Sequence, residues 1–398
     1  MTNANGLTGT PAWIQLLPVG TPPNSNAVSS VIFDESANRL VVYGGCWANC
    51  SPALSDVYVL SHANGLGGDP EWTQVDVTTA EERAYQSAVY DPLNNLMIAF
   101  GGNLAFFGTD QNDTRILSNA NGLVTPSTWT ALDIASDVPP IRGMHGAAYD
   151  TPNNRMIIFG GTNLIKTCCP YVLQDYNDTW VLANANGAAG TPVWTQLSPT
   201  NPLPPVRSDH STVYDPVFNR LIVFGGRQWQ QDAQTSTVLG DLWQLTNANG
   251  LAAAAPAWKA IGQTGDRPGP RFRSAAALDA RNQRMILFGG VNSGDVPTNR
   301  VWVLALQSCN GKPATVVGTL GNDVLIGTPA NDVIVALGGN DSIAGHGGND
   351  TICGGNGNDT LYGGNGDDWL SGDGGADTLN GNGGNDTCTG ETLLNCEL

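Results

Sequence analysis

The sequence predicts an all-β protein that is built from two different repeats. Residues 1–307 contain a long segment that recurs five times, and residues 308–398 contain a nine-residue unit that runs without a break from Gly318 to Thr389. The chain includes 50 glycines and 24 prolines, and no segment shows a convincing helical periodicity. These observations favour strands and turns throughout, in two domains with a boundary after residue 307.

Two sequence markers define the long repeat. Tryptophans in a T-P-x-W-T-Q-L-like context recur at spacings of 59, 57, 65 and 64 residues, and they are Trp13, Trp72, Trp129, Trp194 and Trp258. Glycine pairs follow apolar segments such as RLVVYGG at the same interval, and they are Gly44-Gly45, Gly101-Gly102, Gly160-Gly161, Gly225-Gly226 and Gly289-Gly290. Because two independent markers keep one interval, the five segments are copies of one structural unit.

Each copy divides into four predicted strands. A strand of small residues that ends in aspartate, such as QSAVYD, is followed by the apolar strand that ends in Gly-Gly. A third strand such as DTWVL comes next, and the tryptophan strand follows an N-A-N-G loop. β-branched and aromatic residues bounded by Asn, Asp, Gly and Pro are typical of strands joined by turns.

This pattern of glycine pair, spaced aromatic and outer tryptophan resembles the kelch repeat, over about three quarters of the chain. Kelch repeats build β-propellers with one four-stranded sheet per blade, so the resemblance implies a five-bladed kelch-like propeller in residues 1–307. The fifth copy stops before a tryptophan strand, so we expect the N-terminal residues 13–16 to complete the sheet of residues 274–305 and close the ring. Donation of that strand to a neighbouring molecule is the alternative.

The nine-residue repeat has eight units, which read GTLGNDVLI, GTPANDVIV, ALGGNDSIA, GHGGNDTIC, GGNGNDTLY, GGNGDDWLS, GDGGADTLN and GNGGNDTCT. The sixth position is always aspartate: Asp323, Asp332, Asp341, Asp350, Asp359, Asp368, Asp377 and Asp386. The eighth position is always apolar, and Leu325, Ile334, Ile343, Ile352, Leu361, Leu370 and Leu379 are expected to stack as a narrow core. Composition alone would favour a disordered tail, but the strict phase of the units argues against it.

These units resemble the RTX, or haemolysin-type, calcium-binding repeats, which form a parallel β-roll. The resemblance implies that the eight sixth-position aspartates hold several Ca²⁺ ions, together with carbonyl groups that glycines allow to turn inward. The glycines expected to contribute are Gly339, Gly348, Gly355, Gly357, Gly364, Gly366, Gly375 and Gly384. Since Ca²⁺ takes about 6 to 8 oxygen ligands, neighbouring units must share each ion.

The eight units are not equally regular. The six from Ala336 to Thr389 keep most of their glycines, whereas the first two carry other residues at the glycine positions: Thr319, Leu320, Thr328, Pro329 and Ala330. We therefore expect weak or absent metal binding in the first two units.

The formal net charge of −18 lies mostly in the second repeat, because residues 313–398 contain twelve Asp or Glu and no Lys or Arg. This balance argues against nucleic acid or an anionic membrane as a partner, since phosphate contacts need clustered Lys and Arg. No apolar run of about 18 residues occurs, so no membrane span is expected. A row of carboxylates repels itself without cations, so metal binding and folding of this region should be coupled.

The expected calcium affinity also predicts a location. Extracellular calcium modules bind with dissociation constants on the order of 10⁻⁴ to 10⁻³ M, so we expect a secreted, extracellular protein whose leader is not present in this chain. The eight cysteines fit this, because they show no zinc spacing. The expected disulfides are Cys309–Cys353, Cys388–Cys396 and Cys46–Cys50, with Cys168 and Cys169 either paired together or bonded to other partners.

Candidate catalytic groups in the long repeat are few. His145 and His210 share a position five residues before the aspartate that ends the first strand. Galactose oxidase, a copper enzyme among the kelch propellers, makes a two-histidine metal site the enzymatic alternative, but no cysteine lies in a comparable strand for that enzyme's Tyr-Cys cross-link. Histidines that serve the fold are the expected outcome.

Arginines stand three residues before those positions, at Arg83, Arg142, Arg207 and Arg271. We expect them to tie together carbonyl or carboxylate groups between blades, and an anion-binding mouth is the alternative.

No G-x-S-x-G, H-E-x-x-H, Walker or C-x-x-C motif occurs, and the adjacent Asp367 and Asp368 fall in a predicted calcium turn. The sequence therefore favours a non-enzymatic, extracellular, calcium-binding protein. Its propeller loops would contact a protein or glycan, its roll would fold on Ca²⁺, and self-assembly into a homo-oligomer or filament is a specific version of this role. A galactose-oxidase-like or carbohydrate-active enzyme with a site at the propeller channel is the rival.

Overall fold

The computed structural model describes residues 15–23, 28–46, 53–104, 110–165, 172–200, 202–263 and 266–396. Strands and turns make up these residues, apart from one 3₁₀ turn, η1 (Thr151–Asn153). Within these ranges, no helix is long and apolar enough to cross a membrane. Two compact units are present, one including residues 13–276 and 288–300, the other including residues 277–287 and 301–398. The boundary at residue 307 stays a prediction.

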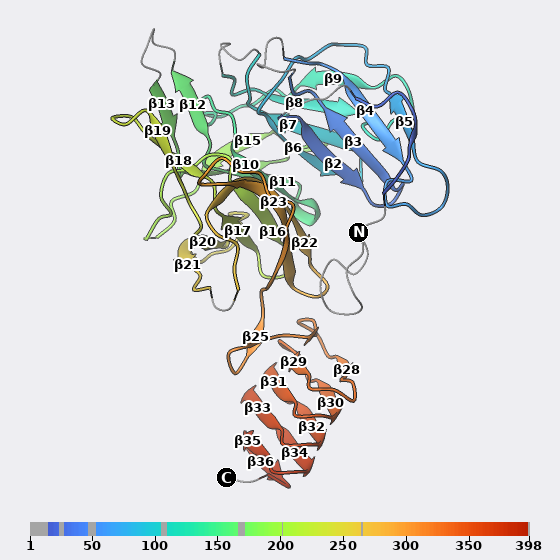
Figure 1. Ribbon diagram of the computed structural model, residues 1–398, viewed down its shortest axis with the longest axis vertical. Helices are drawn as coiled ribbons and strands as arrows, with labels where there is room; N and C mark the ends of the chain where they lie inside the picture. Colours follow the sequence, from blue (N-terminus) through green and yellow to red (C-terminus); the bar gives the residue numbers. More distant parts are fainter. Residues whose placement is uncertain are drawn as a thin grey trace. The chain divides into compact units, whose positions relative to one another are not determined.

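Five antiparallel sheets form the five blades of a propeller, as predicted (Figure 1). Blade 1 contains β2 (Ser30–Asp34), β3 (Arg39–Tyr43), β4 (Val57–Ser61) and β5 (Glu71–Gln74), and blade 2 contains β6 (Ser87–Asp91), β7 (Leu96–Phe100), β8 (Thr114–Ser118) and β9 (Thr128–Ala131). Blade 3 contains β10 (Gly146–Asp150), β11 (Arg155–Phe159), β14 (Thr179–Ala183) and β15 (Val193–Gln196), and blade 4 contains β16 (Ser211–Asp215), β17 (Arg220–Phe224), β20 (Leu242–Thr246) and β21 (Ala257–Ala260). Blade 5 has three described strands, β22 (Arg271–Asp279), β23 (Arg284–Asn292) and β24 (Val301–Ala305).

The extra length of the third and fourth copies forms hairpins after the glycine pair. They are β12 (Thr162–Ile165) with β13 (Val172–Asp175), and β18 (Arg227–Gln230) with β19 (Thr235–Val238). These hairpins form two-stranded sheets of their own, so the four-stranded blade sheets are unaffected.

The first strands of the blades meet one another, which explains their small residues. Strand β6 packs against β2 and β10, and β10 packs against β16. A Cβ atom on Gly146 of β10 would lie 2.0 Å from Thr212 Oγ1 of β16, so only glycine fits at this approach.

The glycine pairs link each blade to the next. The amide of the second glycine donates to the carbonyl of the arginine that precedes the following blade, as in Gly102 to Arg142 and Gly161 to Arg207, each with an N···O distance of 2.9 Å. Gly102 and Gly161 have φ of 81° and 96°, which glycine adopts without strain. The repeated Gly-Gly is therefore a blade connector.

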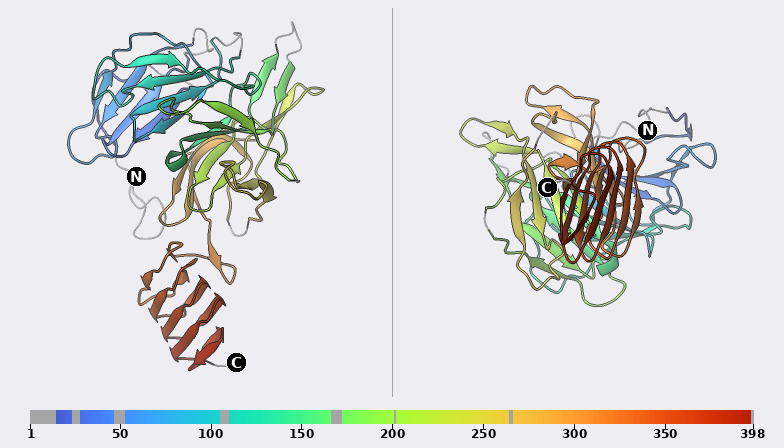
Figure 2. Two further views of the ribbon diagram at one scale, coloured as in Figure 1. Left: turned by 180° about the vertical axis from the view of Figure 1, so that it is seen from behind. Right: turned by 90° about the horizontal axis from the view of Figure 1, so that it is seen from below.

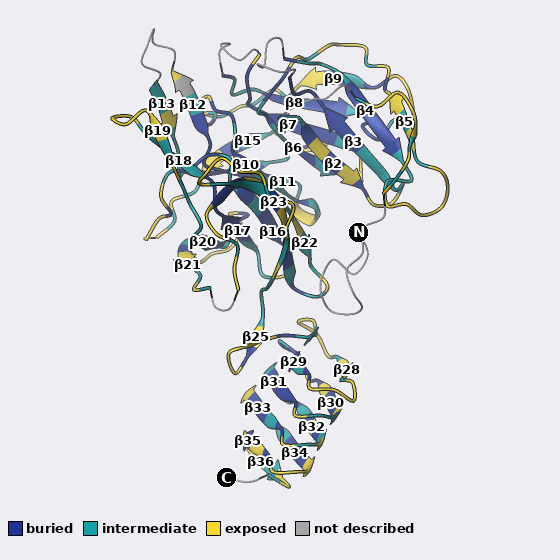
Figure 3. Ribbon diagram, in the orientation of Figure 1, coloured by how far each residue is buried: buried dark blue, intermediate teal, exposed yellow. Residues whose placement is uncertain are grey.

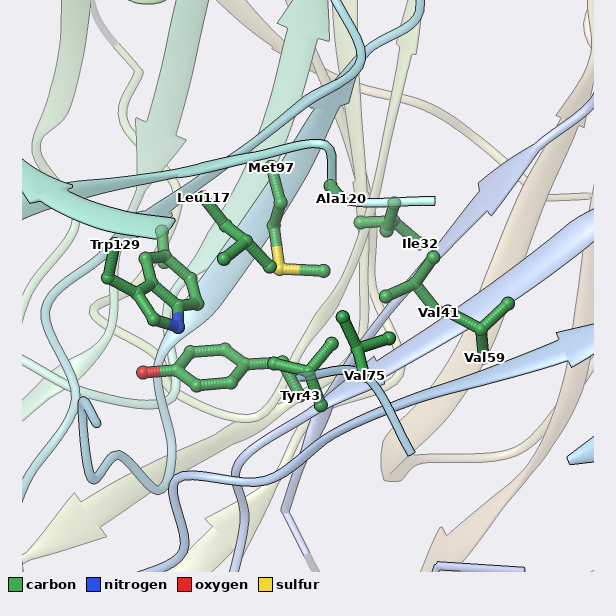
Figure 4. Packing of buried hydrophobic residues seen from close by; sticks show 11 residues of the cluster. Ile32, Val41, Tyr43, Val59, Val75, Met97, Leu117, Ala120 and Trp129 are labelled. Atoms are coloured by element: carbon green, nitrogen blue, oxygen red, sulfur yellow. The ribbon is translucent and has the colours of Figure 1, made fainter. Parts of the chain in front are cut away.

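The two sequence markers of the long repeat also contact each other. The aromatic residue before a glycine pair packs against the tryptophan of the next blade, with ring centroids 4.5 Å apart for Tyr43 and Trp129 (Figure 4). The same contact joins Phe100 to Trp194 at 5.0 Å and Phe159 to Trp258 at 4.7 Å. Each pair lies in a hydrophobic cluster shared by two blades, which explains why the markers keep one interval.

The predicted closing strand, residues 13–16, lies mostly outside the described residues, because residues 13 and 14 are not described. Strand β1 (Val19–Gly20), which follows it, pairs in parallel with β5, and Val19 N donates to Pro70 O at 3.0 Å. Val19 stands six residues after Trp13, and equivalent main-chain hydrogen bonds link the later blades. In each, the amide six residues after the outer tryptophan donates to a carbonyl, in the pairs Thr78 to Ser127, Ala135 to Pro192 and Thr200 to Pro256. Val19 thus has the position of a blade connector, and closure within the chain stays a prediction.

Residues after β25 (Ser308–Cys309) and β26 (Lys312–Pro313) form two parallel sheets, drawn in orange to red in Figure 2. One sheet contains β27 (Val316–Val317), β29 (Val333–Val335), β31 (Thr351–Asn356), β33 (Trp369–Gly374) and β35 (Thr387–Thr389). The other contains β28 (Val324–Ile326), β30 (Ser342–Gly347), β32 (Thr360–Asn365), β34 (Thr378–Gly383) and β36 (Thr392–Leu394). Successive strands alternate between the sheets, so one turn of this roll takes two nine-residue units.

The core of the roll is the predicted one. Ile334, Ile343, Ile352, Leu361, Leu370 and Leu379 are fully buried and pack together, with Leu325 partly buried at one end (Figure 3). The predicted disulfides Cys309–Cys353 and Cys388–Cys396 are both present. Cys46 is also disulfide-bonded, whereas Cys50, Cys168 and Cys169 lie outside the described residues.

Candidate metal centre

The sixth-position aspartates of the roll form two hydrogen-bonded ladders. The main-chain amide of each aspartate donates to Oδ1 of the aspartate eighteen residues later, with N···O distances of 2.7–2.9 Å. The pairs are Asp323–Asp341, Asp332–Asp350, Asp341–Asp359, Asp350–Asp368, Asp359–Asp377 and Asp368–Asp386. These bonds fix one oxygen of each accepting carboxylate, and in the units that begin with glycine the other oxygen, Oδ2, lies beside that glycine.

Five of these Oδ2 atoms are buried and have no hydrogen-bond partner. They belong to Asp341, Asp350, Asp359, Asp368 and Asp377, which are 1–3% exposed. A buried carboxylate oxygen without a partner is costly, because it has lost its water and gained nothing in exchange. A row of such oxygens is what a roll built to bind cations would present in the absence of the cation.

The first-position glycines make the space that faces these oxygens. A Cβ atom built on Gly345 would lie 2.2 Å from Asp350 Oδ2 and 2.6 Å from the carbonyl oxygen of Gly363 in the next turn. On Gly363 it would lie 2.3 Å from Asp368 Oδ2 and 2.8 Å from Gly381 O. A carboxylate oxygen and a carbonyl oxygen thus converge beside a bare Cα, and these are the ligand types that Ca²⁺ prefers.

The sequence analysis did not single out these first-position glycines. They are Gly318, Gly327, Gly345, Gly354, Gly363, Gly372 and Gly381, and only the third unit departs, with Ala336. The recurrence of glycine at this position could have identified it in the sequence. A position that keeps glycine in unit after unit has no room for a methyl group, because it is closely packed or faces a ligand.

The eight glycines that the sequence analysis did single out have a different property. Gly339, Gly348, Gly355, Gly357, Gly364, Gly366, Gly375 and Gly384 all have positive φ, between 96° and 142°. A Cβ on Gly357 would lie 1.8 Å from Gly339 O, so carbonyl groups crowd between turns as expected. Their contribution as calcium ligands stays a prediction.

In each of the two degenerate units, a threonine of the same unit donates hydrogen bonds to the sixth-position carboxylate. Asp323 Oδ2 accepts from Thr319 N at 2.5 Å and Thr319 Oγ1 at 3.0 Å, and Asp332 Oδ2 accepts from Thr328 N at 2.6 Å and Thr328 Oγ1 at 2.8 Å. Threonine donors therefore occupy the place that a cation would take. This geometry supports the expectation of weak or absent metal in the first two units.

The electrostatics of the row also favour a cation. Burial, together with the charges of Asp368 and Asp332, raises the pKa of Asp350 to about 6, although the hydrogen bond from the Asp332 amide acts in the opposite direction. Burial likewise raises the pKa of Asp341, Asp359, Asp368 and Asp377, with neighbouring carboxylates adding to it. The metal-free row therefore disfavours its own negative charge, which a bound divalent cation would offset.

The two histidines of the propeller lie in its packed interior. His145 Nε2 is 2.6 Å from Ser87 Oγ, and its ring packs edge-on against Phe100. His210 packs in the same way against Phe159. Burial, with nearby Arg142, lowers the pKa of His145 well below its usual value, and burial lowers the pKa of His210 to about 3.

Both rings are therefore neutral at physiological pH. Among the described residues, neither histidine belongs to a cluster of three or more His, Cys, Asp or Glu side chains with the geometry of a metal site. The geometry of His145 and His210 fits a role in packing.

The arginine row serves the fold, with one correction to its geometry. Arg142 is fully buried, donates to both oxygens of Asp178 at 2.6 and 2.8 Å, and donates to Gly160 O at 2.9 Å. Arg207 repeats this with Asp241 and Gly225. These guanidinium contacts lie within one blade and not between blades as predicted, because it is the main-chain carbonyl of each arginine that accepts from the preceding glycine pair.

A second feature of the propeller is a ring of main-chain hydrogen bonds between equivalent residues of the five blades. Tyr85 N donates to Val28 O, Met144 N to Tyr85 O, Asp209 N to Met144 O and Arg273 N to Asp209 O, at 2.8–3.2 Å. All five residues have φ between 54° and 60°.

Three of these residues, Tyr85, Met144 and Arg273, line a cavity of about 280 Å³ together with Asp175, Arg227 and Trp229. The left-handed conformation presents side chains of varied chemistry at one mouth of the propeller. Sequence reasoning missed this surface, because its residues share a conformation and not a residue type.

Two family models match the chain. The model of the KLHDC2/KLHL20/DRC7 kelch-repeats domain matches residues 7–187, 104–250 and 174–361. The model of the RTX calcium-binding nonapeptide repeat (4 copies) matches residues 353–388. The second match begins after the degenerate units and covers the last four units, whose first positions are Gly354, Gly363, Gly372 and Gly381.

Two curated proteins are similar to parts of the chain. It is 24% identical over 280 residues to Adagio-like protein 1 of Oryza sativa subsp. japonica, covering 67% of this chain and 39% of that protein. It is 27% identical over 124 residues to Dynein regulatory complex subunit 7 of Chlamydomonas reinhardtii, covering 30% of this chain and 10% of that protein. The chain thus spans less than half the length of these curated relatives.

Among solved structures, the chain is similar to one described as the structure of YjhT, with a TM-score of 0.51 and 11% sequence identity. The similarity covers 74% of this chain and 85% of that chain. At this identity, the likeness shows the fold alone.

Proposed function

Since the chain belongs to the kelch-repeat family and also carries RTX calcium-binding repeats, we propose that it is an extracellular interaction protein whose roll is folded by Ca²⁺. Its propeller would be the platform that contacts a protein or glycan partner. The observation that carries the calcium role is the row of five buried Oδ2 atoms without partners, four of which, those of Asp350, Asp359, Asp368 and Asp377, lie beside a first-position glycine.

The donor set of the roll fits Ca²⁺ better than other metals. Carboxylate and carbonyl oxygens converge there, as they do beside Gly345 and Gly363, and Ca²⁺ prefers such oxygen ligands. Ca²⁺ would supply charge balance and a crosslink between turns. The aspartates at 350, 359, 368 and 377 would hold it, with the first-position glycines leaving room.

An extracellular location is supported by two kinds of observation. The disulfides Cys309–Cys353 and Cys388–Cys396 need an oxidising compartment to persist. RTX-like sites would also fill at the millimolar calcium concentrations found outside cells.

Self-assembly through the roll is the specific version of this function that we propose. Strand β28 is the edge of its sheet, and Leu320, Val324 and Ile326 beside and within it are 58%, 77% and 60% exposed. An exposed edge with apolar side chains is a template for pairing with another chain. Calcium would create this edge by folding the turns next to it.

Light scattering coupled to size-exclusion chromatography tests the assembly. In millimolar calcium we expect species larger than the monomer, which EDTA converts to monomer. A variant with Asp350→Asn and Asp368→Asn should behave in calcium as the unchanged protein does in EDTA. A monomer under all conditions would contradict self-assembly and leave calcium binding to be judged by direct titration.

A further inference from the structure

The segment after the last nine-residue unit, residues 390–396, folds back onto the roll and is called the hook below. Its strand β36 pairs in parallel with β34, with Leu379 opposite Leu393. The Cys388–Cys396 disulfide joins the end of the hook to the core position of the last unit. The hook has no G-x-D pattern, and no family match covers it.

Glu391 of the hook completes the aspartate ladder. Asp377 N donates to Glu391 Oε2 at 2.9 Å, which is the bond that every earlier rung makes with an aspartate Oδ1 eighteen residues on. The residue eighteen after Asp377 is Asn395, which has no carboxylate. Glutamate, with one more methylene, reaches the same amide from four residues earlier in the chain.

Asn395 contributes the second missing group through its main chain. A Cβ on Gly381 would lie 2.3 Å from Asn395 O and 2.3 Å from Asp386 Oδ2. At Gly345 the corresponding atoms are Gly363 O at 2.6 Å and Asp350 Oδ2 at 2.2 Å. Asn395 O therefore takes the place of the carbonyl that the next turn would supply if the repeat continued.

The hook therefore presents the carboxylate and the carbonyl of an absent turn. Asp377, which Glu391 meets, is 1% exposed, and its Oδ2 has no hydrogen-bond partner. A divalent cation would supply the contact that Asp377 Oδ2 lacks.

We propose that the hook completes the last calcium sites at the ends of the two ladders, in which Glu391 serves as a Ca²⁺ ligand beside Asp377 and the Asn395 carbonyl serves as a Ca²⁺ ligand beside Asp386. The Cys388–Cys396 disulfide is the positioning element, because it holds both groups against the roll before the cation arrives. This inference rests on calcium binding by the roll as a whole. It assigns to Glu391 and Asn395 a role that the repeat pattern does not contain.

Isothermal titration of the full chain with CaCl₂ tests the proposal through a Glu391→Gln variant. The matched control is Asp367→Asn, which removes one charge from an exposed position where other units carry asparagine, as at Asn349 and Asn385. We expect Glu391→Gln to bind one Ca²⁺ fewer than the control, or to bind the weakest ion at least about tenfold less tightly, which corresponds to a coupling of about 1.4 kcal/mol.

A second variant, Cys388→Ala with Cys396→Ala, should lose the same ion while the Cys309–Cys353 bridge is kept. If Glu391→Gln binds as many ions as Asp367→Asn with the same affinities, the hook is a structural cap and the proposal is wrong, although calcium binding by the roll stands. If the unchanged protein binds no calcium, the proposed function fails, and the hook proposal fails with it.

Discussion

Replacing Gly363 by alanine should abolish calcium binding beside Asp368. The new Cβ would lie 2.3 Å from Asp368 Oδ2 and 2.8 Å from Gly381 O, so a methyl group fills the space between the two oxygens. One lost site removes about 2.7 kcal/mol of stabilisation when calcium stands at 100 times the dissociation constant. We expect one fewer bound ion by titration and a lower melting temperature of the roll in calcium.

The matched control is Gly347→Ala in a regular unit. A Cβ there meets nothing closer than 3.9 Å, and Gly347 does not have the left-handed φ of the turn glycines. Equal calcium stoichiometry and equal melting temperatures for the Gly363 and Gly347 variants would show that the first-position glycines do not face the metal.

Replacing Arg142 by alanine should produce the largest loss of stability in the propeller. Arg142 is fully buried, binds both carboxylate oxygens of Asp178 and the Gly160 carbonyl, and lies 4.3 Å from the Tyr176 ring centroid. Truncation leaves Asp178 without its paired charge, and breaking such a pair costs about 3–5 kcal/mol. Urea denaturation followed by tryptophan fluorescence, at constant calcium, measures this loss.

Arg273→Ala is the control for that measurement. The Arg273 side chain is 41% exposed, and its ion pair with Asp209 spans 3.3 Å, so its loss should cost at most about 1 kcal/mol. If Arg142→Ala is no more destabilising than Arg273→Ala, the buried arginine row does not hold the blades in the way that its contacts suggest.

Much of the fold is predictable from the sequence because its signals are periodic. The tryptophan and the aromatic residue before Gly-Gly keep one interval because they pack together across blades, as Tyr43 and Trp129 do. The apolar eighth positions of the roll, such as Ile352 and Leu370, are buried without exception in its regular units. A contact that recurs in every repeat requires the same residue types at the same spacing. Such a contact can therefore be predicted from the sequence alone.

The contacts that escaped the sequence analysis are those made once or made by the main chain. The arginine row bridges blades through backbone carbonyls, which no side-chain pattern encodes. Val28, Tyr85, Met144, Asp209 and Arg273 share φ but not chemistry, so no residue pattern marks the cavity that three of them line. Glu391 accepts the hydrogen bond that a sixth-position aspartate accepts in the other units, but it stands four residues before that position. A search for aspartate at the sixth position of each unit therefore does not find it.

The central claim is that calcium folds the roll, and hydrogen exchange measured by mass spectrometry on the full chain tests it most directly. In millimolar calcium, amides of β30, β31, β32, β33 and β34 should be strongly protected, because these strands pair within the two parallel sheets. In EDTA the same peptides should exchange as an unfolded segment does, while peptides from β7, β11 and β17 keep their protection. Equal protection of the roll with and without calcium would contradict the account.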